Sequence, residues 1–552
     1  MRIRYGVRIL WLSVVMVLLF AGLFGRLFQI QIAHGSEYAH MAYSQRTLFL
    51  PVDSRRGMIL DRNGIPLTDP QPAWAVGVFP PLIKEPADTA ARLSGLLHTP
   101  AQQLLQALKA SPGAFWLAKG LTEQAARQVA AANLPGVAVG ITGARYGPGA
   151  LAHHLVGYVN AEGGKLGLEQ AFDEALTGDR APRLVMTMTA RQSPYAGSGV
   201  QTVMPLLGKE PYRLETTIDS QIQRVVEEVL DRQGSGIKAA VVVLDPSDGE
   251  VLAMASRPDF EYGSIATTGT SLLNRALAQY PPGSVFKPVI AAAALEKGLV
   301  KLDEEFYCSG EYDLGPNRFH DVDGTKHGQL TLREAIAKSC NITFLKIGNE
   351  LLGIDAMRTA ALHFGFGQRA GLLGPDHTLA EEQAGNVPRG MADGALQLAF
   401  GQGGLLVTPL QVARFYASIA NGGILPAIKL VKVVRSPTGE VIERPAVGRS
   451  ERVMSTATAK TLQQGLAAVT DPQGVGTGRG AWIPKAGSAG KSGTAEGSDG
   501  AGRIINHAWF AGYFPLQSPR YVTVVLVDGG GLGGAVAGPI FRQIGEGILG
   551  LQ

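Results

Sequence analysis

Ser284 and Lys287 are the pair whose types and spacing most directly suggest chemistry, since one is a hydroxyl nucleophile and the other a primary amine. They follow the turn-forming sequence Pro-Pro-Gly, which predicts that a helix starts here. Residues three apart on a helix share a face, so a neutral Lys287 can take the Ser284 proton, and the helix N-terminus favours negative charge on that oxygen. Taken alone, the spacing is common, and a capping serine beside a solvated lysine is the simpler interpretation.

Two later segments change that interpretation. Ser339-Cys340-Asn341 follows the first pair, and Lys491-Ser492-Gly493-Thr494 follows at a greater distance. In this order the segments form the Ser-x-x-Lys, Ser-x-Asn and Lys-Ser/Thr-Gly set of the penicillin-recognising acyl-serine transferases. Each segment is common by itself, but the ordered set is specific.

Over nearly its whole length the chain resembles the class B penicillin-binding proteins, the membrane-anchored transpeptidases that cross-link peptidoglycan. The resemblance implies that Ser284 attacks the penultimate D-Ala carbonyl of a stem peptide, with Lys287 as its base. Ser339 is then expected to relay a proton toward the leaving D-Ala, and Asn341 to bind the substrate amide. Lys491 supplies positive charge near the substrate carboxylate. β-Lactams are expected to acylate the same serine, and the resemblance implies no organic cofactor.

The last motif is also expected to bind substrate through its neighbouring residues. Ser492 and Thr494 offer hydroxyl donors, and Gly493 leaves room for a substrate backbone beside a strand. The resemblance implies that the backbone N–H groups of Ser284 and Thr494 form the oxyanion hole. A turn lysine followed by a flexible loop is the alternative interpretation of this segment.

Other functions compatible with the motifs are less well supported by the sequence. A bifunctional class A enzyme needs a glycosyltransferase domain with a glutamate motif, which we do not find in residues 34–205. A β-lactam sensor without transpeptidation normally follows several membrane spans. A structural organiser of the cell wall has no need of an intact nucleophile and both lysines.

The composition limits the partners. A chain of 552 residues predicts two or three domains, and the net charge of +4 with 17% charged residues gives no broad basic footprint for nucleic acid. Residues 9–25 are apolar except for Ser13, and Arg2, Arg4 and Arg8 precede them. This pattern predicts a single-pass anchor in the cytoplasmic (inner) membrane, with its N-terminus inside and the catalytic domain outside. A cleaved signal peptide is the alternative, but no clear small-x-small cleavage site follows.

The remaining chain is predicted to be α+β, with a domain order of anchor (1–33), elongated pedestal or dimerisation-like domain (34–205) and transpeptidase domain (206–552). The predicted pedestal has an Asn-Gly hairpin after residue 60, and three helices follow. In the last domain, predicted strands near each end enclose a helical middle, which favours an antiparallel sheet with a helical subdomain. The expected helices are 90–97, 101–109, 123–132 and 540–549, and the expected strands 240–244, 251–255, 508–513 and 521–527.

A second cluster lies between the first two motifs. Cys308, Asp321, His327 and Cys340 include both cysteines of the chain, and four such ligands suit a tetrahedral structural zinc. Some elongation-type members of the family have a similar Asp, Asp, His, Cys site, although this chain has Cys308 at the first position. Asp323 is a competing carboxylate, while a Cys308–Cys340 disulfide or two buried thiols are the alternatives to a metal.

That cluster makes the chain most similar to the elongation-type penicillin-binding protein 2 group, over division and sporulation types. Its expected role is therefore cell elongation and shape. The resemblance also implies a polytopic glycan polymerase of the elongation machinery as the partner of the membrane anchor.

Overall fold

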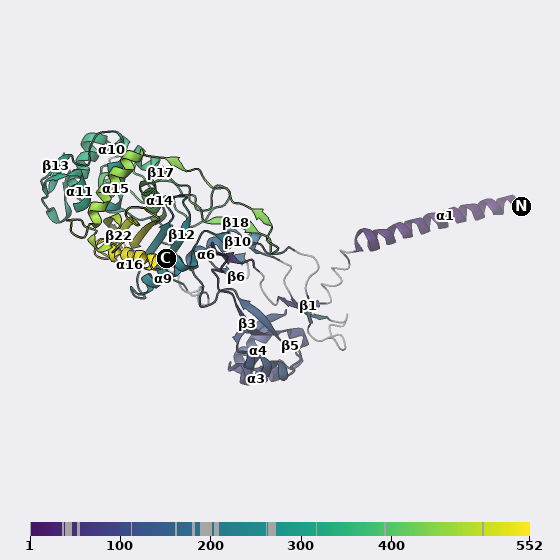
Figure 1. Cartoon of the computed structure of the whole chain (residues 1–552). Helices are drawn as coiled ribbons and strands as arrows, with labels where there is room; N and C mark the ends of the chain where they lie inside the picture. The colour runs from purple at the N-terminus through teal and green to yellow at the C-terminus, as the bar shows by residue number, and fades with distance from the viewer. Residues whose placement is uncertain are drawn as a thin grey trace. The chain divides into compact units, whose positions relative to one another are not determined.

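The computed structural model describes residues 2–35, 38, 47–51, 56–111, 113–160, 163–178, 183–187, 201–203, 209–260, 262, 272–315, 317–390, 394–498 and 502–551 (Figure 1). The chain divides into two compact units, and neither is continuous in sequence. The first consists of Met1–Arg55, Gln71–Arg145 and Asp179–Lys209. The second consists of Arg56–Pro70, Tyr146–Gly178 and Glu210–Gln552.

The first unit begins with the apolar helix α1, Arg2–Phe28, which continues into a π-helical turn, Gln29–Ala33. Within it, Leu10–Ala33 has a mean hydropathy of 2.1 and is not buried against the protein. At ~1.5 Å per residue, its 24 residues extend roughly 36 Å, enough for a hydrocarbon core of ~30 Å. Among the described residues this is the one helix that is long and apolar enough to cross a membrane.

The first unit also contains two antiparallel sheets. One has the order β4-β3-β5, and its core joins Val76 and Val78 of β3 to Leu93, Leu104 and Val129 of three helices. The helices predicted in this region are confirmed, with α5 capped by the Thr122 side chain. The other sheet has the order β1-β8-β9. The elements are α3 (Pro86–Leu97), α4 (Ala101–Ala110), α5 (Glu123–Ala131), β1 (Thr47–Pro51), β3 (Gln71–Val78), β4 (Phe115–Leu121), β5 (Val137–Ala144), β8 (Arg183–Thr187) and β9 (Gln201–Val203).

The centre of the second unit is an antiparallel five-stranded sheet with the order β12-β11-β23-β22-β21. Strand β11 is buried on both faces, which explains its continuous apolar sequence. Alternate residues of the sheet enter two separate cores, and the helices α9 and α16 cover one face. The predicted antiparallel sheet is thus confirmed. The elements are β11 (Ala239–Leu244), β12 (Val251–Arg257), β21 (Ala489–Ser498), β22 (Ile504–Phe514), β23 (Tyr521–Val527), α9 (Ser220–Asp231) and α16 (Ala537–Leu549).

The helical subdomain and α14 share the larger core with the opposite face of the sheet. Short antiparallel strand pairs lie between the helices, and two of them, one enclosing the other, form much of the segment between the first two motifs. The helices are α10 (Lys287–Glu296), α11 (Leu332–Lys338), α12 (Asn341–Lys346), α13 (Ile354–His363), α14 (Pro409–Ala420) and α15 (Thr456–Thr470). The paired strands are β13 (Glu305–Cys308) with β16 (Gly328–Thr331), β14 (Glu311–Leu314) with β15 (Asn317–His320), and β17 (Ile424–Leu425) with β20 (Glu451–Arg452).

Segments from before residue 206 complete the second unit. Strand β2, Ile59–Leu60, pairs in parallel with β10, Arg213–Thr216, and the predicted hairpin is reduced to one bridge between Leu60 and Pro66. The buried Asp61 carboxylate explains this arrangement, because it accepts hydrogen bonds from both the local turn and the start of α9. The remaining elements are β18 (Val431–Arg435), β19 (Val441–Glu443), β6 (Val159–Asn160), β7 (Gly163–Gly164), α6 (His153–Val156), α7 (Gly167–Ala171) and α8 (Asp173–Leu176).

Candidate active site and metal cluster

Ser284 lies in a 3-10 turn, Gly283–Phe286, immediately before α10. The turn requires glycine at position 283, where φ is +57° and a Cβ atom would lie 2.6 Å from the carbonyl oxygen of Thr494. This close approach sets the nucleophile turn directly against β21. Ser284 is half-buried, whereas Lys287 at the first position of α10 is fully buried.

Lys287 joins the first motif to the second. Its ammonium donates hydrogen bonds to the carbonyl oxygen of Ser339, to Ser339 Oγ at 3.2 Å and to Asn341 Oδ1 at 2.7 Å. These hydrogen bonds go to residues of the second motif. The helical spacing instead predicted a contact between Lys287 and the Ser284 oxygen. Burial lowers the pKa of Lys287 to about 8, so a substantial neutral fraction exists near neutral pH. A base of this kind suits proton transfer from a serine.

The second motif forms the turn between α11 and α12. Ser339 ends α11 with φ at +61°, and Cys340 caps α12 by accepting the Thr343 N–H on its sulfur at 3.4 Å. Because three consecutive residues have three different backbone conformations, Ser339 and Asn341 contact Lys287 while Cys340 joins a different cluster. The turn thus separates two sets of side chains that are adjacent in sequence.

The third motif lies on β21, the edge strand of the sheet beside the nucleophile turn. A Cβ atom on Gly493 would lie 3.0 Å from the Pro282 carbonyl oxygen and 3.1 Å from the Val285 nitrogen. The glycine is therefore needed for the turn and strand to meet. Thr494 is half-buried, and its Oγ1 accepts the Gly533 N–H at 3.1 Å. The sequence motif thus forms regular β-structure rather than a flexible loop.

Lys491 is fully buried and donates to the Ser492 carbonyl oxygen at 2.9 Å. Burial, with a smaller contribution from the charge of Lys287, lowers the pKa of Lys491 well below its usual value. An anion bound beside this amine would counter both effects, because it stabilises the charged form. The position is therefore suited to a carboxylate-bearing ligand.

Thr477, which no sequence motif indicated, connects the second and third motifs. Its N–H donates to the Ala337 carbonyl oxygen at 3.0 Å, and its hydroxyl lies 2.7 Å from Ser492 Oγ. Thr477 follows α15 in a glycine-containing loop, where the sequence offers no signal beyond a turn. The structure brings all three predicted motifs together and adds this threonine between two of them.

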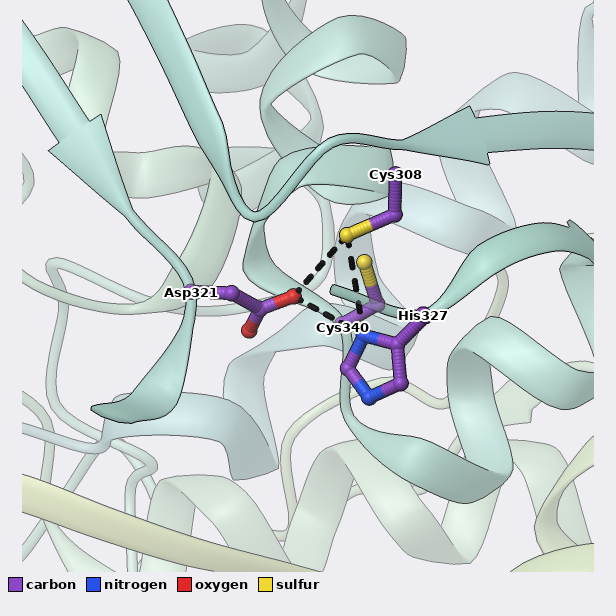
Figure 2. A group of neighbouring side chains, drawn as sticks. All are labelled: Cys308, Asp321, His327 and Cys340. Carbon is purple, nitrogen blue, oxygen red and sulfur yellow. Dashed lines mark hydrogen bonds and ion pairs between the residues drawn. The ribbon is translucent and has the colours of Figure 1, made fainter. Parts of the chain in front are cut away.

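Cys308, Asp321, His327 and Cys340 form the second cluster, with one potential ligand atom of each lying within 4.8 Å of all the others. Figure 2 shows the four side chains converging from separate segments. Backbone pairing brings these segments together. Cys308 of β13 pairs with Gly328 of β16, which is next to His327. The Asp321 N–H donates to the carbonyl oxygen of Gly310, two residues after Cys308. Asp323, the competing carboxylate, is exposed in the neighbouring turn and lies outside this set.

The spacing of the donor atoms is close to that of the ligands of a small tetrahedral cation, with three of them within 3.6 Å of one another and Cys340 Sγ within 4.8 Å of each. Cys308 Sγ lies 3.4 Å from Asp321 Oδ2 and 3.6 Å from His327 Nδ1, and these last two atoms are 3.1 Å apart. Zinc bonds of ~2.0–2.3 Å separate tetrahedral ligands by roughly 3.3–3.8 Å, so the residues fit that ion. Both cysteines are free thiols in the structure and both are buried.

The chemistry of the donor set also fits a cation. Burial, followed by the negative charge of Asp321, raises the pKa of the Cys340 thiol to about 12, which disfavours the thiolate without a cation. Burial alone would raise the pKa of Asp321, but hydrogen bonds, first from the Asn341 N–H, bring it below its usual value. Asp321 Oδ1 accepts that N–H at 3.1 Å while Oδ2 faces the cluster. One carboxylate thus couples the metal-type cluster to the second motif.

Comparisons with known families match two domains of the chain. The model for the penicillin binding protein transpeptidase domain matches residues 239–546, and that for the penicillin-binding protein dimerisation domain matches residues 51–193. The chain therefore belongs to the class B penicillin-binding protein transpeptidases, which confirms the resemblance found in the sequence.

Several curated relatives are similar over most of their length. The peptidoglycan D,D-transpeptidase FtsI of Escherichia coli is 30% identical, over 90% of this chain and 84% of that protein. Stage V sporulation protein D of Bacillus subtilis is 29% identical, over 97% and 84%. The peptidoglycan D,D-transpeptidase MrdA of Haemophilus influenzae is 28% identical, over 96% and 89%. Such similar values do not separate one subtype from another.

A solved structure supports the fold. A peptidoglycan synthetase from Bifidobacterium adolescentis matches with a TM-score of 0.65 and 23% identity, over 92% of this chain and 97% of that one. This likeness covers both the transpeptidase and the preceding domain, so the predicted α+β class of the whole chain is confirmed.

Proposed function

We propose that this chain is a peptidoglycan D,D-transpeptidase that forms an acyl-enzyme on Ser284 and is a target of penicillins. The observation that carries the proposal is the convergence of three sequence motifs around one half-buried serine. We assign its substrates as stem peptides ending in D-Ala-D-Ala. This assignment rests on family membership and on the names of the relatives, which include two D,D-transpeptidases.

In the proposed reaction Lys287 accepts the Ser284 proton as the serine oxygen attacks the penultimate carbonyl carbon. The anionic tetrahedral oxygen is held by the backbone N–H groups of Ser284 and Thr494. The close packing of the nucleophile turn against β21 at Gly283 and Gly493 supports this assignment. Collapse of this intermediate breaks the peptide bond, and the leaving D-Ala nitrogen receives a proton through Ser339. An amine of a second stem peptide then attacks the ester, which forms the cross-link and frees Ser284.

The remaining residues are assigned to substrate binding. Asn341 binds the substrate amide, and Lys491, with the hydroxyls of Ser492 and Thr494, binds the terminal carboxylate. Support comes from the burial of Lys491, because an anion in that position compensates its desolvation. Gly493 lets an extended substrate lie along the edge of β21, where unpaired backbone groups are available.

A fluorescent penicillin tests the assignment of the nucleophile. The wild-type protein should be labelled covalently and Ser284→Ala should not, whereas Ser247→Ala, in an exposed turn, should label normally. Labelling of the Ser284 variant would refute the assignment. Cross-linked product formed from lipid-linked glycan strands separates a transpeptidase from a sensor that is only acylated.

We further propose that Cys308, Asp321, His327 and Cys340 bind one structural Zn²⁺ that holds the Ser339–Asn341 turn. The spacing of the donor atoms and their burial support this proposal over a disulfide. Metal analysis of the purified protein should find one zinc per chain. A peptide map that shows a Cys308–Cys340 disulfide, with no zinc, would refute it.

The similarity of this cluster to the site of some elongation-type members supports a role in cell elongation and shape. Depletion in the native host distinguishes the subtypes, since rounded cells indicate elongation, filaments indicate division, and failure restricted to spores indicates sporulation. We propose the domain order 1–33, 34–205 and 206–552 for the anchor, pedestal and transpeptidase domains.

We also propose that the anchor lies in the inner membrane with its N-terminus in the cytoplasm, because Arg2, Arg4 and Arg8 precede the apolar segment. The anchor is proposed to dock a polytopic glycan polymerase. An exported soluble form that begins near residue 35 should bind penicillin but fail to support growth. Full complementation by that form would contradict the proposed docking.

A further inference from the structure

Two aromatic side chains outside the three motifs hold the turn that carries Ser284. Tyr416 of α14 donates its hydroxyl to the Val285 carbonyl oxygen at 2.9 Å. Trp509 of β22 donates its indole N–H to the Pro281 carbonyl oxygen at 3.0 Å. The two hydrogen bonds therefore bracket the nucleophile, one on each side along the chain.

Both aromatic residues belong to the buried core. Neither Tyr416 nor Trp509 exposes any of its surface, so each hydrogen bond is shielded from water. Trp509 lies opposite Gly493 in the β21–β22 pair, and the missing side chain at Gly493 lets the nucleophile turn approach this part of the sheet. Tyr416 is in the middle of α14, whose ends are fixed by a capping box at Thr408 and by the core. The donors are thus rigidly placed by two different elements.

The backbone between these two carbonyl groups is held as well. The Gly283 N–H donates to the Gly401 carbonyl oxygen at 2.8 Å, and Gly283 itself packs against Thr494. No hydrogen bond within the described part of the chain restrains the Ser284 side chain, so the orientation of its Oγ and of its N–H depends on the backbone of the turn. An error of about 1 Å in that orientation can lower the rate by 10²-fold.

We infer that Tyr416 and Trp509 are positioning residues that set the attack geometry of Ser284 and the direction of its backbone N–H. Neither touches the reacting atoms, and both act through the peptide groups on either side of the serine. This inference rests on the proposed function, because it takes Ser284 as the nucleophile. It extends the active site to two side chains that no motif marks.

The phenol acts here as a donor that does not titrate. Burial raises the pKa of Tyr416 well above its usual value, so its hydroxyl stays protonated in an assay at pH 6 to 9. A positioning role therefore predicts a change in the acylation rate without a change in the shape of its pH profile. A proton-transfer role would alter the profile.

The test is the acylation of the full-length protein by a chromogenic β-lactam, with saturation kinetics that separate binding from the acylation rate constant. Tyr416→Phe removes only the hydroxyl and should lower the rate constant about tenfold, which is the effect of one lost buried hydrogen bond. The binding constant and the pH profile should stay unchanged. Trp509→Phe removes the indole N–H donor. It should also lower the acylation rate constant and leave the binding constant and the pH profile unchanged.

Tyr513→Phe is the matched control. Tyr513 is a fully buried tyrosine on β22, and its hydroxyl has no hydrogen-bond partner among the described residues. Loss of this hydroxyl should leave the acylation rate constant unchanged. Titration of the acylated fraction gives the active protein in each sample, so partial misfolding lowers the amplitude and not the rate constant.

Two results would overturn the inference: wild-type rate constants in both Tyr416→Phe and Trp509→Phe, or an equal loss in Tyr513→Phe. Failure of the proposed function is recognised separately, because Ser284→Ala would then still be labelled. Tyr416→Phe and Trp509→Phe variants that both acylate normally, beside a Ser284→Ala variant that does not acylate, refute the positioning role alone.

Discussion

The two turns that carry the active-site hydroxyls are held in different ways. The Ser284 turn rests on the central sheet, where backbone contacts with β21 and hydrogen bonds from buried aromatic residues fix it. The Ser339 turn joins two short helices, and its link to the rest of the subdomain runs through Asp321 to a cluster of potential metal ligands. Ordinary core packing positions the proposed nucleophile, whereas the second turn is proposed to depend on a zinc cross-link.

This difference indicates which substitutions should disturb each of the two turns. Core packing is spread over many side chains, so no single contact decides the position of the Ser284 turn. A metal site concentrates its effect in a few ligands, and loss of one ligand releases the whole segment. Substitutions in the two regions should therefore have different effects on acylation and on stability.

The largest effect is expected at the residue that joins the two turns. Lys287→Ala removes the proposed base and also the hydrogen bonds to Ser339 and Asn341. Acylation should fall by about 10²–10⁴-fold, the usual contribution of a general base. Stopped-flow acylation measures it, with Lys297→Ala at an exposed position of the same segment as control. Near-normal acylation by Lys287→Ala would show that Lys287 does not couple the Ser284 turn to the Ser339 turn.

The pH dependence of acylation tests whether Lys287 acts as the base. With a pKa of about 8, Lys287 is mostly protonated at pH 6 and half neutral at pH 8. Because the neutral amine is the base, the rate should rise roughly 50-fold between these pH values and level off above pH 9. A flat profile over this range in the wild-type protein would contradict the role of a titrating lysine.

A change on β21 tests substrate capture beside the rigidly held turn. Lys491→Ala should weaken binding of a β-lactam with a free carboxylate about 10–100-fold, since a charge-assisted interaction is lost. Its methyl ester should bind nearly as it does to the wild type. Lys485→Ala, at an exposed position before the strand, is the control. Equal losses for the acid and the ester would show that Lys491 does not recognise the carboxylate.

His327→Ala tests the cross-linked turn by itself. Loss of the proposed zinc should lower the melting temperature by roughly 5 °C, as for a bound ion worth a few kcal/mol. Acylation should slow although every catalytic group remains, and a chelator should produce the same change in the wild type. Asp323→Ala removes an exposed carboxylate outside the cluster and should change neither property. A disulfide in place of the metal would make the protein insensitive to both treatments.

The smallest effect is expected at Thr477, which touches both regions. Thr477→Val keeps the backbone N–H bond to Ala337 but removes the hydroxyl, which lies beside Ser492 Oγ and donates weakly, at 3.3 Å, to the Ala337 carbonyl oxygen. Binding of a carboxylate-bearing β-lactam should weaken about fivefold, the effect of one hydrogen bond. Thr461→Val on α15 loses only a bond within its own helix and should bind normally. An unchanged affinity in Thr477→Val would show that Ser492 does not need the Thr477 hydroxyl for carboxylate binding.

Local sequence patterns predicted much of the fold because the interactions they report are local. The helices expected at 101–109 and 123–132 are α4 and α5, and the strand expected at 240–244 is β11. The Asn-Gly hairpin predicted after residue 60 forms as a tight turn with one antiparallel bridge, Leu60 to Pro66. The local pattern did not indicate that the other edge of β2 pairs with β10, because that contact is far away in sequence.

The sequence by itself determined the family, the order of the three motifs and the identity of the residues that can do chemistry, because these depend on residue type and spacing alone. Only the tertiary structure decided that Lys287 contacts Ser339 and Asn341, that Asp321 rather than Asp323 joins the cysteines, and that Thr477, Tyr416 and Trp509 hold the motifs. The physical reason is distance along the chain. Contacts between residues far apart in sequence are set by how sheets and helices pack, and no local pattern records that packing.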